Sequence, residues 1–493
     1  MWTQTPRQPS RPLAAAGRFA VAGEAAIIRF MRTLHLTLVA LWLSLAGCGP
    51  AQKPPAAASA PALRDVPIGL CEDHPPESTS DARIREDLQA LAQAGVRVLR
   101  VSFGWDDLEP ERDRYDFSPV ERVLPVAEEL GIRLIPYVCY TPSWLAAPGV
   151  PQNDIYRSVP SDVREFEQIM RLLAARYRGR LQTWELWNEP DNKEYWLGTP
   201  GEYAQLLAAG ARGVRAGDPN ARVVLGGIAG HLEFLEELLT KHDSARAVDI
   251  VNLHSYAETW NPEPIEAVTS YLQRAAELVR QHGEGEPLWL AEVGYSSFRR
   301  GEDVSHWVKA RFDFEHTPQF QGAALWRILA QAVAVPEVQL IAWYELRDLP
   351  AGTEVIGDQN NRHLGVLSPE GQPKPAFGAL QRAVSLLSGG VRSIAVQVRA
   401  RDGARVEARA FQRADGRCVL VAWLPTQSLP QPPAAASAAF TVAARTRAVQ
   451  ARASDAYGVG SVDIPLQTQS PISIAELSLQ PEHTHVVEIP ACE

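Results

Sequence analysis

Between residues 66 and 388 the chain alternates short apolar runs, rich in β-branched and aromatic residues, with longer amphipathic segments. The runs predict eight strands, at 66–71, 96–103, 132–140, 181–187, 222–229, 248–254, 287–293 and 338–345. Apolar residues that recur at three- and four-residue steps predict helices at 82–94, 120–130, 163–177, 202–216 and 265–282. Strands that are each followed by a helix favour the α/β class and a closed parallel (β/α)8 TIM barrel, with a six-stranded open sheet as the alternative.

The pattern changes after about residue 390. Alternating, β-branched runs punctuated by turn residues replace the helical period at 392–400, 405–412, 418–425, 439–444, 448–458, 472–479 and 484–490. Short strands at this density predict a C-terminal β-sandwich over residues 389–493. The stretch 430–438, rich in Pro, Ala and Ser, is expected to be an exposed loop within it.

An apolar run at residues 34–46 is too short to span a bilayer comfortably and has the proportions of a signal peptide. It ends in Leu-Ala-Gly-Cys48, which resembles the box of a bacterial lipoprotein signal. That resemblance implies cleavage before Cys48 and lipidation of its sulfur, with residues 1–48 as the signal region. An ordinary secretory signal with an incidental cysteine is the alternative. Because residues 1–30 lack an apolar run, we expect translation to start at Met31.

Residues 49–65 are rich in Pro and Ala and predict a tether between a lipid anchor and the folded part. We therefore expect a protein exported to the bacterial cell envelope, in the periplasm or at the outer membrane, and attached to a membrane through its N-terminal lipid. Export permits disulfides. Cys418 and Cys492 lie in the same segment and could pair, whereas the sequence leaves the state of Cys71 and Cys139 open.

Composition narrows the possible partners. A net charge of −10 without a block of five or six like charges argues against a nucleic-acid surface. With no CxxC and no Cys/His cluster at ligand spacing, we expect no metal site, and we expect no cofactor. Thirteen Trp against three Met is heavy use of the side chain best suited to stacking on flat, weakly polar rings.

Two glutamates end strands of the predicted barrel, at the rim where the active sites of such barrels lie. Glu189 follows the fourth strand and Glu292 ends the seventh. Cleavage of an acetal needs one carboxyl group to protonate the leaving oxygen and another to attack or stabilise the sugar. Burial would raise the pKa of the acid, while Arg100 or Tyr256 could keep the nucleophile ionised. The alternative is that both glutamates are solvated loop carboxylates and that the chemistry of the barrel lies elsewhere.

Other polar and aromatic residues at the strand ends are candidates for substrate contact. Glu185 has the same strand parity as Glu189 and is expected to pair with a buried arginine such as Arg100. His254 is either a core histidine or a site residue. Rings at the rim are either sugar platforms or core, namely Trp105, Tyr140, Trp144, Trp187, Trp196, Trp260 and Trp343. Trp289, in mid-strand, is expected to be core.

Five segments carry a resemblance to a known family. They are TWELWNEPD (183–191), LHSY (253–256), LAEVGYS (290–296) and HLGVL (363–367) with GQPKPAF (371–377). They resemble the clan of retaining (β/α)8 glycoside hydrolases, and most closely its family 39-like branch with a C-terminal β-sandwich, over about residues 66–493.

The resemblance implies Glu189 as the acid/base and Glu292 as the nucleophile. It implies Asn188 as the partner of the sugar 2-OH, His254 and Tyr256 on the nucleophile's side, and Trp343 beneath the bound sugar. A retaining outcome predicts a carboxyl separation of ~5–5.5 Å.

We therefore expect a retaining enzyme that cleaves β-glycosidic bonds in an exopolysaccharide or related β-glycan by double displacement. The alternative is a catalytically silent, polysaccharide-binding surface lipoprotein, which the persistence of both carboxylates disfavours. A uronate substrate would call for a cationic clamp, for which Arg299 and Arg300 are candidates. Linkage, endo or exo action and oligomeric state stay open.

Overall fold

The computed structural model describes residues 62–299, 304–306, 308–353, 355–401 and 403–493. The signal region with Met31 and Cys48, nearly all of the tether, and Arg300 lie outside the described residues. No helix of the described part has both the length and the apolar character needed to cross a bilayer.

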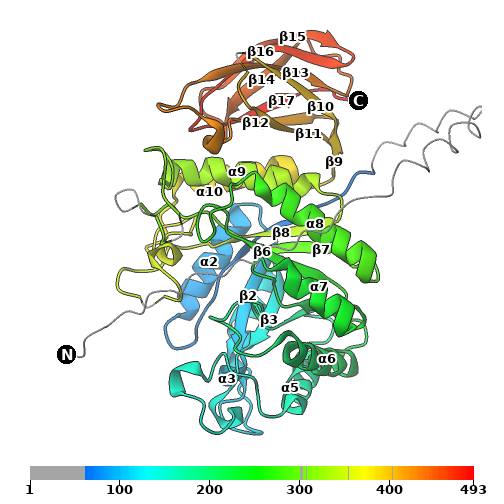
Figure 1. The fold of residues 1–493 in the computed structure, drawn as a ribbon, viewed down its shortest axis with the longest axis vertical. Helices are drawn as coiled ribbons and strands as arrows, with labels where there is room; N and C mark the ends of the chain where they lie inside the picture. Colours follow the sequence, from blue (N-terminus) through cyan, green and yellow to red (C-terminus); the bar gives the residue numbers. More distant parts are fainter. Residues whose placement is uncertain (1–61, 300–303, 307, 354, 402) are drawn as a thin grey trace, which may run out of the picture. The chain divides into compact units, whose positions relative to one another are not determined.

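Eight parallel strands form the first sheet, in the order β5-β4-β3-β2-β1-β8-β7-β6. Figure 1 labels β2, β3, β6, β7 and β8 among them. Their bounds are β1 Ile68–Cys71, β2 Val98–Gly104, β3 Arg133–Cys139, β4 Thr183–Leu186, β5 Arg222–Leu225, β6 Val251–Ser255, β7 Leu288–Val293 and β8 Val338–Tyr344. Parallel bridges Val224–Ile250 and Ile228–Leu253 join the last two edges. The predicted TIM barrel is confirmed, and the six-stranded alternative is wrong.

Helices connect the barrel strands, and the five predicted from periodicity are confirmed with shifts of one or two residues at their ends. They are α2 Asp81–Gln93, α3 Trp105–Leu108, α4 Ser118–Glu129, α5 Val163–Arg176, α6 Pro200–Gly217, α7 Leu232–Lys241, α8 Ala267–His282, α9 Pro318–Ala334 and α10 Pro375–Leu387. Short 3-10 turns lie at Ser143–Leu145, Gln152–Asp154, Ser244–Ala247, Gln359–Arg362 and Thr426–Ser428. Thr199 and Glu202 form a capping box that fixes the start of α6.

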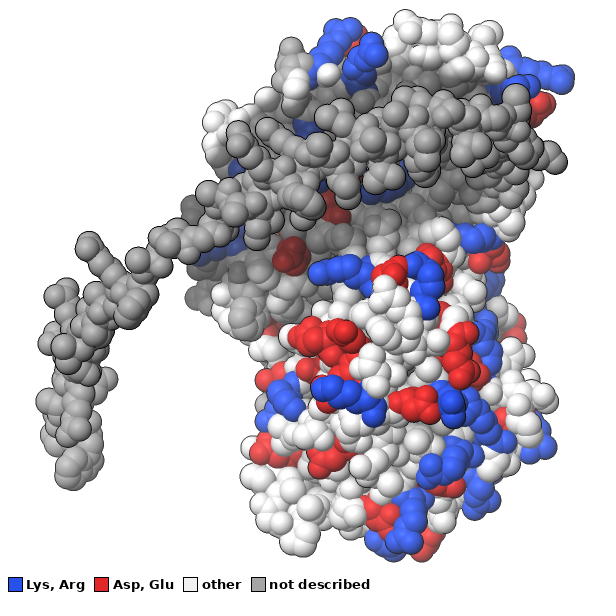
Figure 2. Space-filling view, turned by 45° about the vertical axis from the view of Figure 1, so that its right-hand side comes forward, with Lys and Arg blue, Asp and Glu red and all other residues white. Residues whose placement is uncertain are grey.

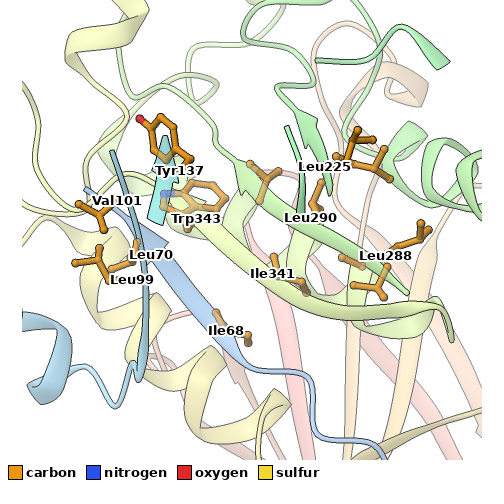
Figure 3. Close-up of a cluster of buried hydrophobic side chains, with 14 of the residues drawn as sticks. Ile68, Leu70, Leu99, Val101, Tyr137, Leu225, Leu288, Leu290, Ile341 and Trp343 are labelled. Atoms are coloured by element: carbon orange, nitrogen blue, oxygen red, sulfur yellow. The ribbon is translucent and has the colours of Figure 1, made fainter. Parts of the chain in front are cut away.

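Strand alternation divides the barrel side chains into an inner and an outer set. The inner set packs as one small apolar cluster that includes Val98, Trp289 and Ala342. The outer set faces the helices and includes Leu70, Leu99, Ile341 and Trp343 (Figure 3). Trp289 is 2% exposed, so its expected place in the core is confirmed.

The C-terminal strands form a nine-stranded antiparallel arrangement, in the order β10-β13-β16-β15-β14-β17-β12-β11-β9. They are β9 Val391–Ile394, β10 Val396–Ala400, β11 Glu407–Arg413, β12 Cys418–Trp423, β13 Ala436–Val442, β14 Gln450–Asp455, β15 Val462–Gln469, β16 Ile472–Leu479 and β17 Thr484–Ile489. Side chains from both ends of this order share one apolar cluster, among them Leu420 of β12 and Phe440 of β13, as in the predicted sandwich. A disulfide joins Cys418 to Cys492.

Three details of the sandwich correct the sequence expectation. The single run predicted at 392–400 is two strands, β9 and β10, which lie at opposite ends of the strand order. Residues 436–438 open β13 instead of ending a loop. β15 was missed because Leu466 is its only buried side chain, so the apolar alternation is too weak to show in the sequence.

Helix α9 is buried on all sides because it packs against α10 and β8 and also against strands of the sandwich. Its Arg327 is 0% exposed and donates to the carbonyls of Pro481 and His483 at 2.9 and 3.0 Å and to the Thr484 hydroxyl at 3.1 Å. This buried cation, satisfied by sandwich backbone, explains how an apolar helix can carry an arginine at its centre.

Candidate active site

A buried ion pair underlies the site. Arg100 of β2 binds Glu185 of β4 in a bidentate manner, Nε to Oε2 and Nη2 to Oε1, both at 2.8 Å. Both side chains are 1% exposed or less. Glu185 also accepts from Asn252 Nδ2 at 3.0 Å and from the Gly227 backbone N–H at 3.1 Å. The structural role expected for Glu185 is therefore confirmed, because a buried carboxylate needs such partners.

The same guanidinium orients two side chains of the predicted site. Arg100 Nη1 donates to Glu292 Oε2 at 2.6 Å, and Nη2 donates to Asn188 Oδ1 at 2.9 Å. On the other side, the Tyr256 hydroxyl donates to Glu292 Oε1 at 2.6 Å. Each oxygen of Glu292 thus has its own donor, which holds the carboxylate in one orientation.

A bulge in β7 points Glu292 inward. Between Leu290 and Val293, β7 advances three residues while β8 advances only from Ile341 to Trp343, and a matching shift occurs against β6. Ala291 belongs to the inner apolar cluster, so regular alternation would turn Glu292 outward. The extra residue reverses the parity and brings the carboxylate onto Arg100.

Left-handed backbone shapes the end of β4. Trp187 has φ 82° and Glu189 has φ 43°, a region that non-glycine residues seldom occupy. Trp187 turns away from the site to pack on Trp196, with ring centroids 5.1 Å apart. Asn188 and Glu189 then both face the barrel axis, although a regular strand would separate consecutive side chains.

Both oxygens of Glu189 are held. Its Oε1 lies 2.9 Å from His254 Nδ1, and its Oε2 accepts from Asn192 Nδ2 at 2.9 Å. His254 Nδ1 is also 3.6 Å from Glu292 Oε1, so the imidazole lies between the two glutamates. One oxygen of each glutamate and one ring nitrogen of His254 all lie within 4.8 Å of one another.

Three such groups could ligate a divalent ion. Hydrogen bonds, however, already explain why Glu189, His254 and Glu292 lie so close together. Asn252 Oδ1 accepts from the Ala291 N–H at 3.0 Å, which turns its Nδ2 toward His254 Nε2 at 3.5 Å. In this assignment Nε2 is the acceptor and Nδ1 carries the proton that is donated to Glu189. A protonated Nδ1 is a donor and not a metal ligand.

Burial is the largest influence on the pKa values of Glu189 and Glu292. It raises the pKa of Glu189 to about 7, against the opposing hydrogen bond of Asn192 and the charge of Arg100. Burial also raises the pKa of Glu292, opposed by Arg100 and the Tyr256 hydroxyl. Burial lowers the pKa of His254, which keeps the imidazole neutral near neutral pH.

Gly227 makes room for His254. A Cβ at this position would lie 1.8 Å from His254 Nε2, so any side chain would displace the imidazole. The close approach explains why glycine stands at this point of the β5 exit.

The predicted aromatic contacts are only partly supported by the geometry. Tyr140 and Trp144 are half-buried; Tyr140 packs on Tyr195 at 6.3 Å, and Trp144 Nε1 donates to the Glu109 carbonyl at 2.7 Å. Trp105 and Trp343 are 0% exposed and have no ring face open to a sugar, which corrects their assignment as substrate contacts.

The alternation of side chains along β8 explains why Trp343 was wrongly predicted to contact the substrate. Trp343 pairs with Val293 and with Leu70 and packs in the outer apolar layer, where Figure 3 labels it with Leu70. The next residue, Tyr344, packs against the inner cluster, and its ring lies 6.2 Å from that of Tyr256. Counting alternation from the apolar Ala342 would have identified Tyr344 from the sequence.

The remaining candidates are packed against or bonded to other groups. Trp187 and Trp196 are 0% exposed, whereas Trp260 is half-buried and its Nε1 donates to Asp358 at 3.1 Å. Arg299 donates to the carbonyls of Phe312 and Glu315, at 2.7 and 3.2 Å. Figure 2 shows acidic and basic side chains interspersed on the face in view, without a continuous basic stripe.

Residues 75–284 match the model of the glycosyl hydrolases family 39. A beta-galactosidase LacZ of Heyndrickxia coagulans is 30% identical over 77 residues, a match that covers 15% of this chain and 12% of that relative. Among solved structures, a family 39 glycoside hydrolase from Bacteroides cellulosilyticus WH2 has a TM-score of 0.64 at 20% identity, covering 86% of this chain and 81% of the other.

A monomeric beta-xylosidase from Caulobacter crescentus CB15 has a TM-score of 0.59 at 17% identity, covering 87% of this chain and 98% of the other. At these identities the two structures show the shared fold, and the family model adds the sequence signature. The barrel, the antiparallel domain that follows it and the family match over residues 75–284 lead to one class: this chain is a glycoside hydrolase that is similar to family 39 enzymes.

Proposed function

We propose that this enzyme cleaves β-glycosidic bonds with retention of configuration, with Glu189 as acid/base and Glu292 as nucleophile. The observation that carries the proposal is the approach of their carboxylate oxygens to within 4.8 Å. Retaining enzymes place the two carboxyl groups about 5–5.5 Å apart, whereas inverting enzymes need about 6.5–9.5 Å to admit a water. The short separation supports direct attack by a carboxylate.

In the first step, a Glu292 oxygen attacks the anomeric carbon while Glu189 gives its proton to the leaving oxygen. A covalent glycosyl-enzyme forms, and the aglycone departs as an alcohol. In the second step, Glu189 takes a proton from water, which attacks the same carbon and releases Glu292. A Glu189 pKa of about 7 suits a group that must both give and take a proton near neutral pH.

Asn188 is proposed to bind the sugar 2-OH. Its Oδ1 accepts from Arg100 at 2.9 Å, which orients its Nδ2 as the donor left for the substrate. A hydrogen bond to the 2-OH strengthens as the oxocarbenium-like transition state forms. His254 and Tyr256 act from the other side, by holding Glu189 and Glu292 in position.

We propose a polysaccharide substrate, an exopolysaccharide or related β-glycan. The names of the compared proteins, a beta-xylosidase and a beta-galactosidase, supply the first linkages for a test panel. Purified enzyme is incubated with neutral, amino and uronate β-glycans, and released products are identified by mass. Products no shorter than two sugars throughout the digest indicate endo action, and monosaccharide from the first time point indicates exo action.

We propose export with a lipid on Cys48. The disulfide between Cys418 and Cys492 supports an oxidising compartment, where such bonds persist. Labelling cells with a fatty-acid analogue should mark the wild-type protein, and Cys48→Ser should lose the mark and move to the soluble fraction. Labelling that survives Cys48→Ser contradicts the anchor.

The mechanism is tested by trapping. A 2-deoxy-2-fluoro glycosyl fluoride should leave a covalent sugar on Glu292, located by mass spectrometry of the peptide. Glu292→Gln should lose both label and turnover while keeping its melting temperature near wild type, and the exposed Glu233→Gln is the matched control. Turnover near wild type in Glu292→Gln contradicts the assignment. A folded wild-type enzyme that binds the glycans without turnover or label favours the silent binding protein.

A further inference from the structure

Asn252 is a buried residue of β6, 0% exposed, whose side chain contacts a neighbour of each proposed catalytic glutamate. Its Oδ1 accepts from the Ala291 backbone N–H at 3.0 Å, and its Nδ2 lies 3.5 Å from His254 Nε2. Ala291 directly precedes Glu292 in the chain, and His254 Nδ1 lies 2.9 Å from Glu189 Oε1. One amide is therefore bonded toward both glutamates.

The orientation of the Asn252 amide is fixed by two partners that can each play only one role. A backbone N–H only donates, so the atom that faces Ala291 is Oδ1. The carboxylate of Glu185, paired with Arg100, accepts, so the atom 3.0 Å from its Oε1 is Nδ2. The second hydrogen of Nδ2 is left for His254 Nε2, which must then be the acceptor.

This orientation places the imidazole proton of His254 on Nδ1. Burial lowers the pKa of His254, so the ring is neutral near neutral pH and carries a single N–H. Because Nε2 accepts from Asn252, that N–H is on Nδ1 and donates to Glu189 Oε1. In the other tautomer Nδ1 would be an acceptor, and protonated Glu189 would give its proton to the ring instead of the leaving oxygen.

Asn252 also supports the bulge of β7. From Asn252, β6 advances two residues while β7 advances three, from Trp289 to Glu292. The extra residue of a bulge loses its place in the backbone ladder, and here the Ala291 N–H donates to Asn252 Oδ1 instead. A side-chain acceptor thus satisfies the backbone at the point that turns Glu292 inward.

We propose that Asn252 is a positioning residue that acts through both catalytic glutamates. Its Nδ2 sets the tautomer of His254 and so leaves the proton of Glu189 for the leaving oxygen. Its Oδ1 holds the bulge that presents Glu292 to the sugar. The inference rests on the proposed function and deepens it, by naming a residue that controls how the two acids are used.

The first test determines the tautomer in the full chain and needs no substrate. Histidines are labelled with isotopic nitrogen, and NMR above neutral pH distinguishes protonated from unprotonated ring nitrogens. The signals of His254 are identified by their loss in His254→Gln. We expect a protonated Nδ1 and an unprotonated Nε2 in the wild type. In Asn252→Asp an oxygen replaces Nδ2, so Nε2 should become protonated.

Kinetics separate the two contacts of the amide. In Asn252→Asp, the ring protonated on Nε2 either takes the proton of Glu189 or, as an imidazolium, holds Glu189 ionised. Turnover of an alkyl glycoside of the sugar released in the glycan panel should therefore fall by at least about 100-fold, the lower end of what general acid–base catalysis contributes. Labelling of Glu292 by the matching 2-deoxy-2-fluoro dinitrophenyl glycoside, whose leaving group needs no proton, should stay close to the wild-type rate, because an oxygen still accepts from the Ala291 N–H.

Asn252→Ala removes both contacts, so it should slow the labelling of Glu292 as well as the turnover of the alkyl glycoside. Faster labelling in Asn252→Asp than in Asn252→Ala is the expected rescue by the conservative variant. The exposed Asn220→Asp is the matched control and should change neither rate.

A wild-type His254 protonated on Nε2 overturns the inference, even if the variants fail to fold. Equal losses of turnover and labelling in Asn252→Asp, or wild-type labelling in Asn252→Ala, overturn it as well. A wild-type enzyme without turnover or label contradicts the proposed function instead, and the tautomer, which is measured without substrate, still decides the role of Asn252.

Discussion

Substitution of Asn192 offers the sharpest test of what sets the pKa of Glu189. Its Nδ2 donates to Glu189 Oε2 at 2.9 Å, and its Oδ1 accepts from the Glu194 N–H at 3.0 Å, which fixes the amide orientation. The bond favours the ionised carboxylate and opposes the effect of burial, which holds the pKa at about 7. Asn192→Ala removes this donor and leaves the backbone bonds of the segment in place.

The size of the effect follows from the strength of the lost bond. A hydrogen bond to a charged group contributes about 1.5–3 kcal/mol. Since one pKa unit corresponds to about 1.4 kcal/mol, the pKa of Glu189 should rise by about one to two units. Because the donor stabilises only the ionised form, its loss lets Glu189 keep its proton to higher pH. The basic limb of the pH profile should therefore move upward.

The assay is kcat/KM against pH on a soluble glycan or aryl glycoside. Asn192→Asp keeps an oxygen for the Glu194 N–H but replaces the donor by a second acid, so it should shift the basic limb further than Asn192→Ala does. Asn220→Ala, at an exposed position, is the control. A basic limb that stays within about 0.3 pH units of wild type in both Asn192 variants refutes the reasoning.

Three further predictions follow from the geometry. Gly227→Ala should lower kcat by at least tenfold in a folded protein, since its Cβ would fall 1.8 Å from His254 Nε2; activity with unchanged circular dichroism is the measurement. Trp343→Ala should cost about 3–5 kcal/mol of unfolding free energy at unchanged KM, whereas Tyr344→Ala should lower kcat/KM more than it lowers the melting temperature. Cys418→Ser should lose about 2–4 kcal/mol of stability in denaturant titrations, with activity at 25 °C retained.

The positions of the two glutamates show how much of the site the pattern of strands in the sequence can predict. Eight apolar runs with helical segments between them predict a barrel, and the rule that such barrels work at the carboxyl ends of their strands brings Glu189 and Glu292 to one rim. The pairing of Arg100 with Glu185 also follows from sequence, because a charge in mid-strand must find a partner in the core.

The aromatic residues show where the same reasoning fails. Trp343 and Trp105 stand at strand ends, yet both are buried in the outer layer. A chain position near the rim does not say which way a ring points, since successive side chains of a strand face opposite sides. Tyr344, one residue on, is the ring that faces inward.

Local pattern along the chain thus determined the strands, the helices and the two acids, because periodicity reports which face of each element is apolar. Only the tertiary structure decided that the acids meet. The bulge in β7 and the left-handed residues around Asn188 each reverse a side-chain direction that regular alternation would have set otherwise. Such irregularities are held by packing from distant segments, including Arg100 and the inner cluster, and packing among distant segments leaves no period in the sequence.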